Sequence, residues 1–434
     1  MTHGAHTNRT ISAQGIARVE GEGSLRVEVR DGRVSDVALD IFEPPRYFEA
    51  MLVGRHFLEA PDITARICGI CPVAYQMSAC AAMEDACSVQ VSEQVRALRR
   101  LLYCGEWIQS HALHIYLLHA PDFLGCADAV EMAERDPSIV ERGLDIKRVG
   151  NLIMETVGGR AVHPVNVRVG GFYRAPDPDA IASLADPLRR ARDLALATVQ
   201  WVSGFEFPDL DASYRFVALR DEGRYPIDRG RPSSSDGLDL DAGQFADVVV
   251  EEHVARSTAL HARLEGRDHY LTGPLARYAL NSSVLPPLAL EAARAAGLSA
   301  VCTNPFRSII VRAVELVFAC DEALGLVEAY EPPNPPAQLI VARAGVGTGV
   351  TEAPRGVLLH QYEIDDRGLI VRARIVPPTS QNLLTMEDDL RRVVEGGAAL
   401  DEHDLQWRCE QSVRNHDPCI SCAAHFLDLT VVHS

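Results

Sequence analysis

Two pairs of cysteines near opposite ends of the chain constrain its fold more than any other feature. Cys68 and Cys71 lie in RICGICP, and Cys419 and Cys422 lie in DPCISCAAH, close to the end of the 434 residues. A Cys-x-x-Cys turn directs two sulfurs toward one point, so two such turns can form a site with four thiolates. A chain that builds this site must bring its two ends together around a common core.

The spacing of the cysteines leaves the identity of the metal open. Structural zinc, an iron–sulfur cluster and a catalytic soft-metal centre all use four thiolates. Zinc ribbons usually place their pairs within about 20 residues of each other, and thioredoxin-like redox pairs occur singly. The remaining cysteines show no ligand spacing, and we interpret them as small buried hydrophobes. These are Cys80, Cys87, Cys104, Cys126, Cys302, Cys320 and Cys409.

Composition and charge narrow the class of protein. Apolar residues make up 47% and charged residues 24%, which is average for a globular chain with a sizeable core. The net charge of −18 argues against nucleic acid and anionic membranes as main partners, because phosphate contacts need clustered Lys and Arg. Residues 1–15 lack the apolar core of a secretory leader, and no run reaches the roughly 18 apolar residues of a membrane span. We therefore expect a cytoplasmic protein, whose cysteines are ligands or packed thiols rather than a disulfide frame.

The pattern of apolar residues predicts an α+β fold with a mostly helical core bundle. Alternation over residues 15–45 predicts a meander of strands near the N-terminus. Apolar residues at helical spacing predict the helices, and the first begins at a Ser cap and ends before a Pro. The predicted helices span residues 92–122, 145–159, 186–205, 244–256 and 306–330. Residues 224–241 and 331–337 are rich in Pro, Gly or Ser and predict loops.

A β-hairpin is predicted in the C-terminal half of the chain. Two alternating runs flank the turn residues 365–368, and a hairpin brings its two ends side by side. Residues 352–356 (EAPRG) and 375–382 (IVPPTSQN) should therefore be neighbours. The loop at 331–337 could mark a domain boundary, but the cysteine pairs on either side of it should act together. We expect one integrated domain over residues 1–434.

The paired cysteine segments resemble those of nickel–iron hydrogenase large subunits. Both halves of that signature occur at opposite ends of one chain, which makes the resemblance specific. Other segments along nearly the whole chain also resemble blocks of this family. They are RVEGEG (18–23), PPRYFEAMLVGR (44–55), HALHIYLLHAPDF (111–123), GGRAVHPVNVRVGG (158–171), EAPRG and VPPTSQN (376–382). The type they most resemble is the soluble, bidirectional NAD(P)-linked or sulfhydrogenase-like enzyme.

The resemblance implies the hydrogenase large-subunit fold and a bimetallic centre. All four thiolates would bind nickel. Cys71 and Cys422 would also bridge to an iron that carries CO and cyanide, whereas Cys68 and Cys419 would be terminal ligands. Thiolates are soft donors and suit such metals. A terminal thiolate is then the first candidate base for the proton of H₂.

Several residues near the centre match functional residues of the family. Glu20 matches a glutamate that relays protons from the terminal thiolate. Arg355 matches the arginine above the open metal position, and Asp122 and Asp417 match the acids that hold this arginine. An always-charged donor in that place can polarise a bound ligand.

Further matches imply a cyanide pocket and a second metal site. Pro378 and Thr379 match the residues around one cyanide, to which Thr379 would supply a hydroxyl donor. Glu49 matches a ligand of a distal magnesium or second iron, since carboxylates suit hard cations. His425 would be the imidazole ligand there, with the backbone carbonyl of Ile375 as a further candidate.

The remaining predictions concern the C-terminal tail, Tyr75 and three histidines. In the family a peptidase cuts after the histidine at His425 once nickel is loaded, so residues 426–434 would be a removable propeptide. The alternative is an uncut C-terminal strand. Tyr75 stands where many relatives have a histidine, and it can donate through its hydroxyl but cannot take a proton near neutral pH. The histidines at 111, 114 and 119 share one helix, and packing is a commoner role for such residues than metal binding.

The resemblance implies an enzyme that catalyses reversible heterolytic cleavage of H₂. The chain shows no dinucleotide motif and no separate set of cluster cysteines. Electrons would therefore leave through an iron–sulfur small subunit, and reach FAD and NAD(P) on diaphorase subunits. A maturation peptidase and nickel-insertion factors would be further partners. A hydrogen sensor, a non-catalytic relative such as the quinone-site subunit of respiratory complex I, and a zinc-stabilised binding protein are the alternatives.

Overall fold

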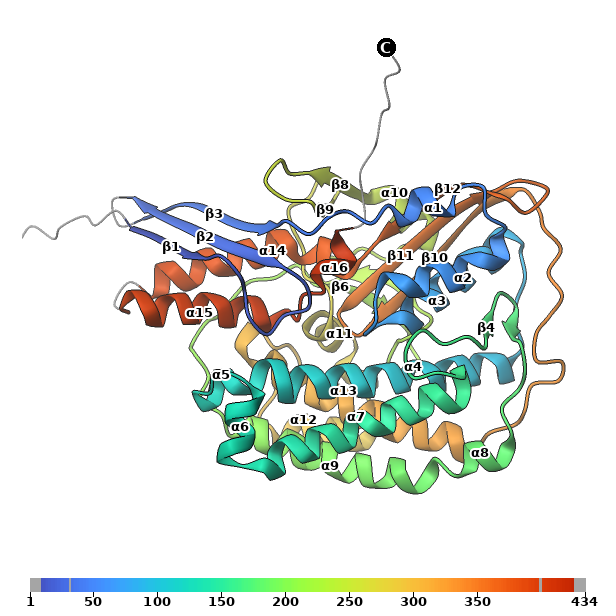
Figure 1. Ribbon diagram of the computed structural model, residues 1–434, viewed down its shortest axis with the longest axis horizontal. Helices are drawn as coiled ribbons and strands as arrows, with labels where there is room; N and C mark the ends of the chain where they lie inside the picture. The colour runs from blue at the N-terminus through green and yellow to red at the C-terminus, as the bar shows by residue number, and fades with distance from the viewer. Residues whose placement is uncertain (1–8, 31–32, 398–399, 425–434) are drawn as a thin grey trace, which may run out of the picture.

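Helices contribute most of the regular structure in residues 9–30, 33–397 and 400–424, the parts of the chain that the computed structural model describes (Figure 1). The strands are β1 (Arg9–Ala13), β2 (Gly23–Arg30), β3 (Arg33–Ile41), β4 (Val167–Arg168), β5 (Gly171–Phe172), β6 (Val217–Arg220), β7 (Arg231–Ser234), β8 (Val249–His253), β9 (Leu260–Leu264), β10 (Gly345–Ala353), β11 (Gly356–Ile364) and β12 (Ile370–Val376). The α-helices are α1 (Phe48–Leu52), α2 (Ala60–Thr64), α3 (Pro72–Ala86), α4 (Glu93–Leu113), α5 (Ala120–Leu124), α6 (Ala129–Arg135), α7 (Pro137–Gly158), α8 (Pro178–Ala182), α9 (Ala185–Ser203), α10 (Ala242–Val248), α11 (Pro274–Asn281), α12 (Pro287–Ala295), α13 (Ser308–Glu328), α14 (Pro378–Gly396), α15 (Glu402–Asn415) and α16 (Ile420–Ala423).

Four long helices form the bundle at the bottom of Figure 1, where α4, α7, α9 and α13 pack together. Their positions confirm the helices predicted near residues 92–122, 145–159, 186–205 and 306–330. Ser92 caps α4 as expected, because its Oγ accepts the N–H of Val95 at 3.3 Å. Both α4 and α13 bury residues on nearly all sides, and α4 passes directly beneath the cysteine site.

Helix α4 continues into a π-helical turn, His114–His119, before α5 begins. Single π turns inside helices occur often at functional sites. The wider turn places the rings of His114 and His119 on the same side, with their centroids 5.0 Å apart.

Two antiparallel sheets of three strands cover the bundle. The first has the order β1-β2-β3, which confirms the predicted meander, and its apolar face packs on α14 and α15. The second has the order β10-β11-β12, which confirms the hairpin, with Leu359 opposite Val376. Strand β10 was not predicted, and helix α3 lies close against it. A Cβ at Gly347 would come within 2.0 Å of the carbonyl oxygen of Ala82, so only glycine permits this approach.

One predicted helix is wrong over half of its length. Helix α10 ends at Val248, and the chain continues as strand β8, which pairs with β9. The cause is a run of three valines, whose branched side chains favour a strand when a partner strand is available. In the described residues, none of the helices is both long and apolar enough to cross a lipid bilayer.

Candidate metal centre

The first cysteine pair lies in the turn that leads into helix α3. Cys68 follows a short 3-10 helix, and Cys71 is the N-cap of α3, with Pro72 in the first helical position. Proline suits that position because the first turn of a helix does not need its N–H. The sulfur of Cys68 accepts the N–H groups of Ile70 and Cys71, each at 3.3 Å. These bonds fix the position of the Cys68 sulfur.

The second cysteine pair lies at the start of α16, the short helix in the centre of Figure 1. Asp417 has φ 52°, a left-handed conformation that turns the chain into the pair. The N–H of Cys419 donates to Oγ1 of Thr379 at 2.9 Å. The Sγ atom of Cys419 lies 3.5 Å from that of Cys68 and 2.6 Å from that of Cys422.

The four sulfurs converge on one buried point, as predicted. All lie within 4.8 Å of one another, and all four residues are buried. Hydrogen bonds from the neighbouring thiols, that of Cys419 first, lower the pKa of Cys68, whereas burial raises the pKa of Cys419. Part of the cluster therefore keeps its protons until a cation replaces them. This all-sulfur donor set fits soft metals such as nickel and low-spin iron.

Glu20 reaches the centre from the loop before β2. Its Oε2 atom lies 3.0 Å from Sγ of Cys419 and also accepts the N–H of Ser421 at 3.2 Å. Its backbone carbonyl accepts the N–H of Ile420 at 2.9 Å, which fixes the loop against α16. The side chain is half-buried, so it connects the thiol to the surface. The hydroxyl of Ser421 donates to Glu43, a second acid further out.

Arg355 lies in the turn between β10 and β11 and is buried beside the second pair. Its Nε donates to the carbonyl of Asp417 at 2.8 Å, and its Nη2 donates to Oδ1 of the same residue at 3.1 Å. Asp417 thus holds Arg355, as predicted. The Nη1 atom is buried and has no hydrogen-bond partner in the described residues. A buried guanidinium N–H without an acceptor is what a site for a further, electron-rich ligand requires.

Asp122 differs from its prediction. Its carboxylate accepts hydrogen bonds from Nε and Nη2 of Arg414 at 2.7 and 2.8 Å, and from Arg18 at 2.5 Å. In the described residues it binds these two arginines and not Arg355. The physical reason is that Arg18 and Arg414 lie within hydrogen-bond distance of the carboxylate and neutralise it there. Asp122 therefore holds Arg414, which precedes the second cysteine pair in the chain, and it does not hold Arg355.

The other residues predicted around the cyanide lie at the start of α14. Pro378 is its first residue, and Thr379 touches the second cysteine pair through the bond to Cys419. The hairpin was expected to bring this segment beside residues 352–356, and the structure places it against Val357, the residue that follows them. Nε2 of Gln381 donates to the carbonyl of Val357 at 2.6 Å.

Glu49 lies on α1, next to the end of β12. Its Oε1 accepts the N–H of Ile375 at 2.6 Å, so these two predicted residues are neighbours. Burial raises the pKa of Glu49 to about 7. Glu49, Glu251 and Arg374 line one cleft at the surface. His425, the third predicted ligand, lies outside the described residues.

The histidines on α4 and its π turn are packed and paired, as the sequence favoured. His114 donates from Nε2 to the carbonyl of Arg414 at 2.9 Å, and Nε2 of His119 lies 3.0 Å from Oδ1 of Asn415. His111 lies 3.0 Å from a carboxylate oxygen of Glu315. Burial lowers the pKa of all three. His114 and His119 thus support the segment before the second cysteine pair, whereas His111 lies beside Glu315 on α13.

Sequence reasoning missed two buried charged residues near the centre. Glu106 on α4 binds the start of α3, and Arg277 on α11 donates to the carbonyls of Ala353 and Pro354, in the turn that carries Arg355. Both are completely buried. The available signal was a charged residue within an apolar helical pattern, and a charged residue that such a pattern buries needs a polar partner.

Comparison with known proteins identifies the family. A family model described as nickel-dependent hydrogenase matches residues 46–145. The sulfhydrogenase 1 subunit alpha of Pyrococcus furiosus is 33% identical over 96% of this chain and 98% of the relative. The chain belongs to the nickel-dependent hydrogenase family. The NAD-reducing hydrogenase HoxS subunit beta of Cupriavidus necator is 28% identical over 97% of this chain and 95% of its own length. A crystal structure of an NAD⁺-reducing [NiFe]-hydrogenase superposes with a TM-score of 0.85 at 26% identity, over 96% of this chain and 99% of that one.

The protein is therefore the large, catalytic subunit of a nickel–iron hydrogenase, and the four cysteines are its site for nickel and iron. These findings do not favour the zinc-stabilised binding protein or the hydrogen sensor.

Proposed function

We propose that this hydrogenase cleaves H₂ reversibly into protons and electrons, and that it exchanges the electrons with NAD(P) through partner subunits. One observation carries the proposal. Four buried thiols meet at one point, and one of them, that of Cys419, lies 3.0 Å from the carboxylate of Glu20. A site that splits H₂ heterolytically needs soft metals and an adjacent proton acceptor, and this arrangement offers both.

The four cysteines would hold the two metals in different ways. All four thiolates would bind nickel, while Cys71 and Cys422 would also bind an iron that carries CO and cyanide. When bound, this metal pair supplies a Lewis-acidic site that polarises H₂. Pro378 and Thr379 would surround one cyanide. The unpaired Nη1 of Arg355 supports this assignment, because an anionic ligand would satisfy it.

The protein side chains would move the proton. A terminal thiolate, Cys419 or Cys68, would accept it, and Glu20 would take it from Cys419 and release it toward the surface. Ser421 and Glu43 extend this line of polar groups outward. Arg355, held by Asp417, would polarise the ligand that occupies the open metal position.

A distal cation would tie down the C-terminal end. Glu49, the carbonyl of Ile375 and His425 would bind magnesium or a second iron. Cleavage after His425 would remove residues 426–434 after nickel is loaded. The closeness of Glu49 to Ile375 supports such a site. An intact mass of active enzyme that ends at Ser434 would contradict the cleavage.

Electrons would leave near the first cysteine pair. Gly69 is exposed although Cys68 and Cys71 on either side of it are buried, so the centre is close to the surface there. His163 donates to the carbonyl of Ala65 at 2.7 Å, and its neighbour Val162 is 46% exposed. We propose that an iron–sulfur small subunit docks here. Diaphorase subunits with FAD and NAD(P) would follow, and the complex would be cytoplasmic, with this chain as one integrated domain.

Infrared spectroscopy of the purified complex tests the proposal most directly. CO and cyanide stretches are expected, together with nickel by elemental analysis and iron in excess of nickel, because the partner subunits carry iron–sulfur clusters. H₂-dependent reduction of NAD⁺ and NADP⁺ then tests the electron route and shows which of the two nucleotides the complex prefers. Zinc without nickel, or an absence of both kinds of stretch, would refute the bimetallic centre. The stretches without reduction of either nucleotide would refute only the route to NAD(P).

A further inference from the structure

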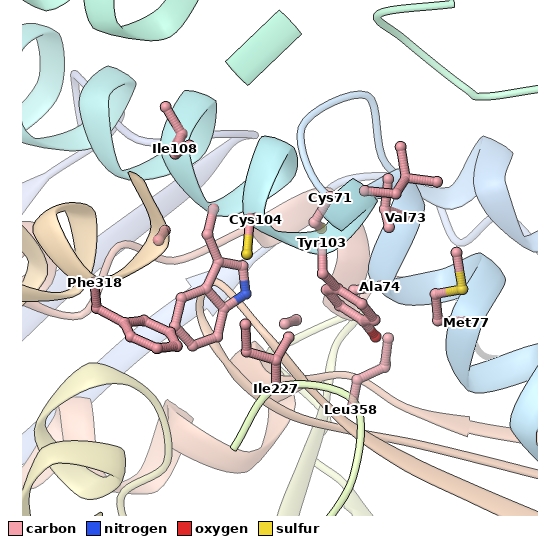
Figure 2. Packing of buried hydrophobic residues seen from close by; sticks show 14 of the residues in the cluster. Cys71, Val73, Ala74, Met77, Tyr103, Cys104, Ile108, Ile227, Phe318 and Leu358 are labelled. Carbon is pink, nitrogen blue, oxygen red and sulfur yellow. The ribbon is translucent and has the colours of Figure 1, made fainter. Parts of the chain in front are cut away.

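Helix α3, which carries the first cysteine pair, is capped by a residue from another helix. In most helices the N-cap side chain accepts the N–H of the second or third helical residue. The N-cap of α3 is Cys71, and it makes no such bond. The N–H groups of Val73 and Ala74 donate instead to the carboxylate of Glu106 on α4, at 2.6 and 3.1 Å. Figure 2 shows Val73 and Ala74 beside α4, next to Tyr103, one helical turn before Glu106.

Glu106 is an unexpected residue in this place. Its side chain is completely buried, and no Arg or Lys is among its hydrogen-bond partners in the described residues. Burial raises its pKa well above the usual range. A buried acid without a hydrogen-bonded cation is destabilising, and the charge of Arg355 offsets this only in part, so its presence points to a role near the site.

The same face of α4 also holds the other side of the cysteine loop. Gln109, which is three residues after Glu106, donates from Nε2 to the carbonyl of Ile70 at 2.5 Å. The chain is thus fixed by α4 directly before and directly after Cys71. This arrangement determines where the sulfur of Cys71 can point.

The two sulfurs of the first pair have different surroundings. The sulfur of Cys68 accepts two backbone N–H groups, whereas the sulfur of Cys71 accepts none in the described residues. A thiolate that binds two metals has fewer lone pairs left for N–H donors than a thiolate that binds one, so the free sulfur of Cys71 suits the bridging position better than that of Cys68. The N–H groups of α3 that Cys71 would otherwise cap are occupied by Glu106.

We propose that Glu106 is a positioning residue that keeps the sulfur of Cys71 away from the N-terminus of α3, so that Cys71 and not Cys68 bridges the two metals. This inference rests on the nickel–iron pair of the proposed function. It explains, from hydrogen bonds within the chain, why two adjacent cysteines take different roles.

Two substitutions of equal length separate the acceptor oxygen from the volume of the side chain. Glu106→Met fills the space but cannot accept the N–H groups, so Cys71 is expected to turn toward them. Metal content should fall about 10- to 100-fold, as is typical when a supporting residue is lost. In the molecules that keep metals, the CO and cyanide stretches should move to higher wavenumber, because Cys71 donates less charge to iron. Glu106→Gln keeps an acceptor oxygen and should retain the metals.

A matched control removes the N-cap of a different helix. Ser92→Ala removes the cap of α4 and should lower the melting temperature without moving the infrared bands. Normal metal content and unmoved bands in Glu106→Met would overturn the proposal. So would loss of metals in Glu106→Gln, whether or not Glu106→Met folds. If the unsubstituted enzyme shows no CO and cyanide stretches, both the proposed function and this inference are overturned. If the stretches are present but do not move when Glu106 is replaced by methionine, only the inference is overturned.

Discussion

A carboxylate contact distinguishes Cys419 from the other three cysteines. Glu20 is the acid that hydrogen-bonds a cysteine sulfur in the described residues, at 3.0 Å. Glu20→Gln keeps the shape and the bond to Ser421 but cannot take a proton. We predict that turnover of H₂ falls by about 10²- to 10⁴-fold, the usual contribution of a proton-transfer group. Nickel and iron content should not change, and dye-linked H₂ oxidation with infrared spectra of the same sample measures both.

Glu43→Gln provides the control for this substitution. Glu43 is one step further from the thiol, and water at the surface can replace it there. Its effect should be much smaller than that of Glu20→Gln. Equal turnover in Glu20→Gln and the unsubstituted enzyme would show that the proton leaves by another route.

Arg355 makes two bonds to Asp417 that a lysine cannot reproduce. Nε and Nη2 bind the carbonyl and the carboxylate of Asp417 together, and Nη1 remains for a ligand. Lysine keeps the charge but not the planar fork. We predict that Arg355→Lys lowers kcat by about 10²- to 10³-fold, the typical effect of losing one preorganised donor. Metal content should stay normal, and Arg96→Lys, at a half-buried position where Arg96 pairs with the exposed Glu93, should have no effect. A kcat within twofold of the unsubstituted enzyme would contradict this role for Arg355.

The helices and strands that could be predicted are those whose apolar residues repeat at one regular spacing, either helical or alternating. Helices α4 and α13 are apolar at helical spacing, and the hairpin β11–β12 alternates around a clear turn. Strand β8 could not be predicted, because its valines also fit a helix and only the partner strand β9 decides. Strand β10 is rich in glycine and has no alternating signal, and it exists because α3 packs against it.

The site residues also divide into those that a local motif predicts and those whose role depends on contacts with distant parts of the chain. The cysteines, Glu20, Arg355 and Asp417 belong to short motifs, and their mutual contacts agree with the prediction. Asp122 does not, since its carboxylate binds Arg18 and Arg414, two arginines outside its own motif that the sequence does not place beside it. Glu106 carries no motif, because its role depends on a contact between two helices that the sequence does not place together.

The turn that presents Arg355 is held by backbone contact with the start of α11. Gly273 has φ +107°, and a Cβ there would lie 2.7 Å from the carbonyl oxygen of Arg355. We predict that Gly273→Ala lowers stability by about 1–3 kcal/mol through backbone strain and also displaces Arg355. Turnover should therefore fall at least about tenfold, the effect of roughly 1.4 kcal/mol on the barrier. Thermal unfolding and dye-linked H₂ oxidation measure the two effects.

Gly266→Ala is the control that separates backbone strain at the substituted glycine from displacement of Arg355. Gly266 also has a left-handed conformation, φ +65°, but a Cβ there would meet nothing within 4 Å. This variant should lose stability and keep its turnover. If Gly273→Ala also kept full turnover, the contact with α11 would not control Arg355.

The whole chain is closed into one structure by segments from both ends. The loop at Glu20, the turn at Cys68 and the segment Asp417–Cys422 meet over α4, and Arg414 binds Asp122 across most of the sequence. Such distant contacts form late in folding, since loop closure must come first. Cations that bind only the folded chain should therefore stabilise all of it at once.

The distal site offers a measurement of this coupling through pH. Burial raises the pKa of Glu49 from 4.5 to about 7, so between these values the folded, metal-free chain binds a proton that the unfolded chain has released. Glu49 then makes the free energy of unfolding decrease as pH rises from 4.5 to 7, by a total on the order of 3 kcal/mol. Glu49→Gln should reduce the slope by this amount and leave the contribution of Glu352, whose pKa burial also raises to about 7, whereas Glu93→Gln at an exposed site should leave the whole slope. Saturating Mg²⁺ should reduce the slope of the unsubstituted chain in the same way, because a bound cation keeps the Glu49 carboxylate ionised in the folded state. A slope that is the same in the unsubstituted chain, in Glu49→Gln and in Mg²⁺ would mean that Glu49 is not a cation ligand and that other buried acids set the acid dependence of this fold.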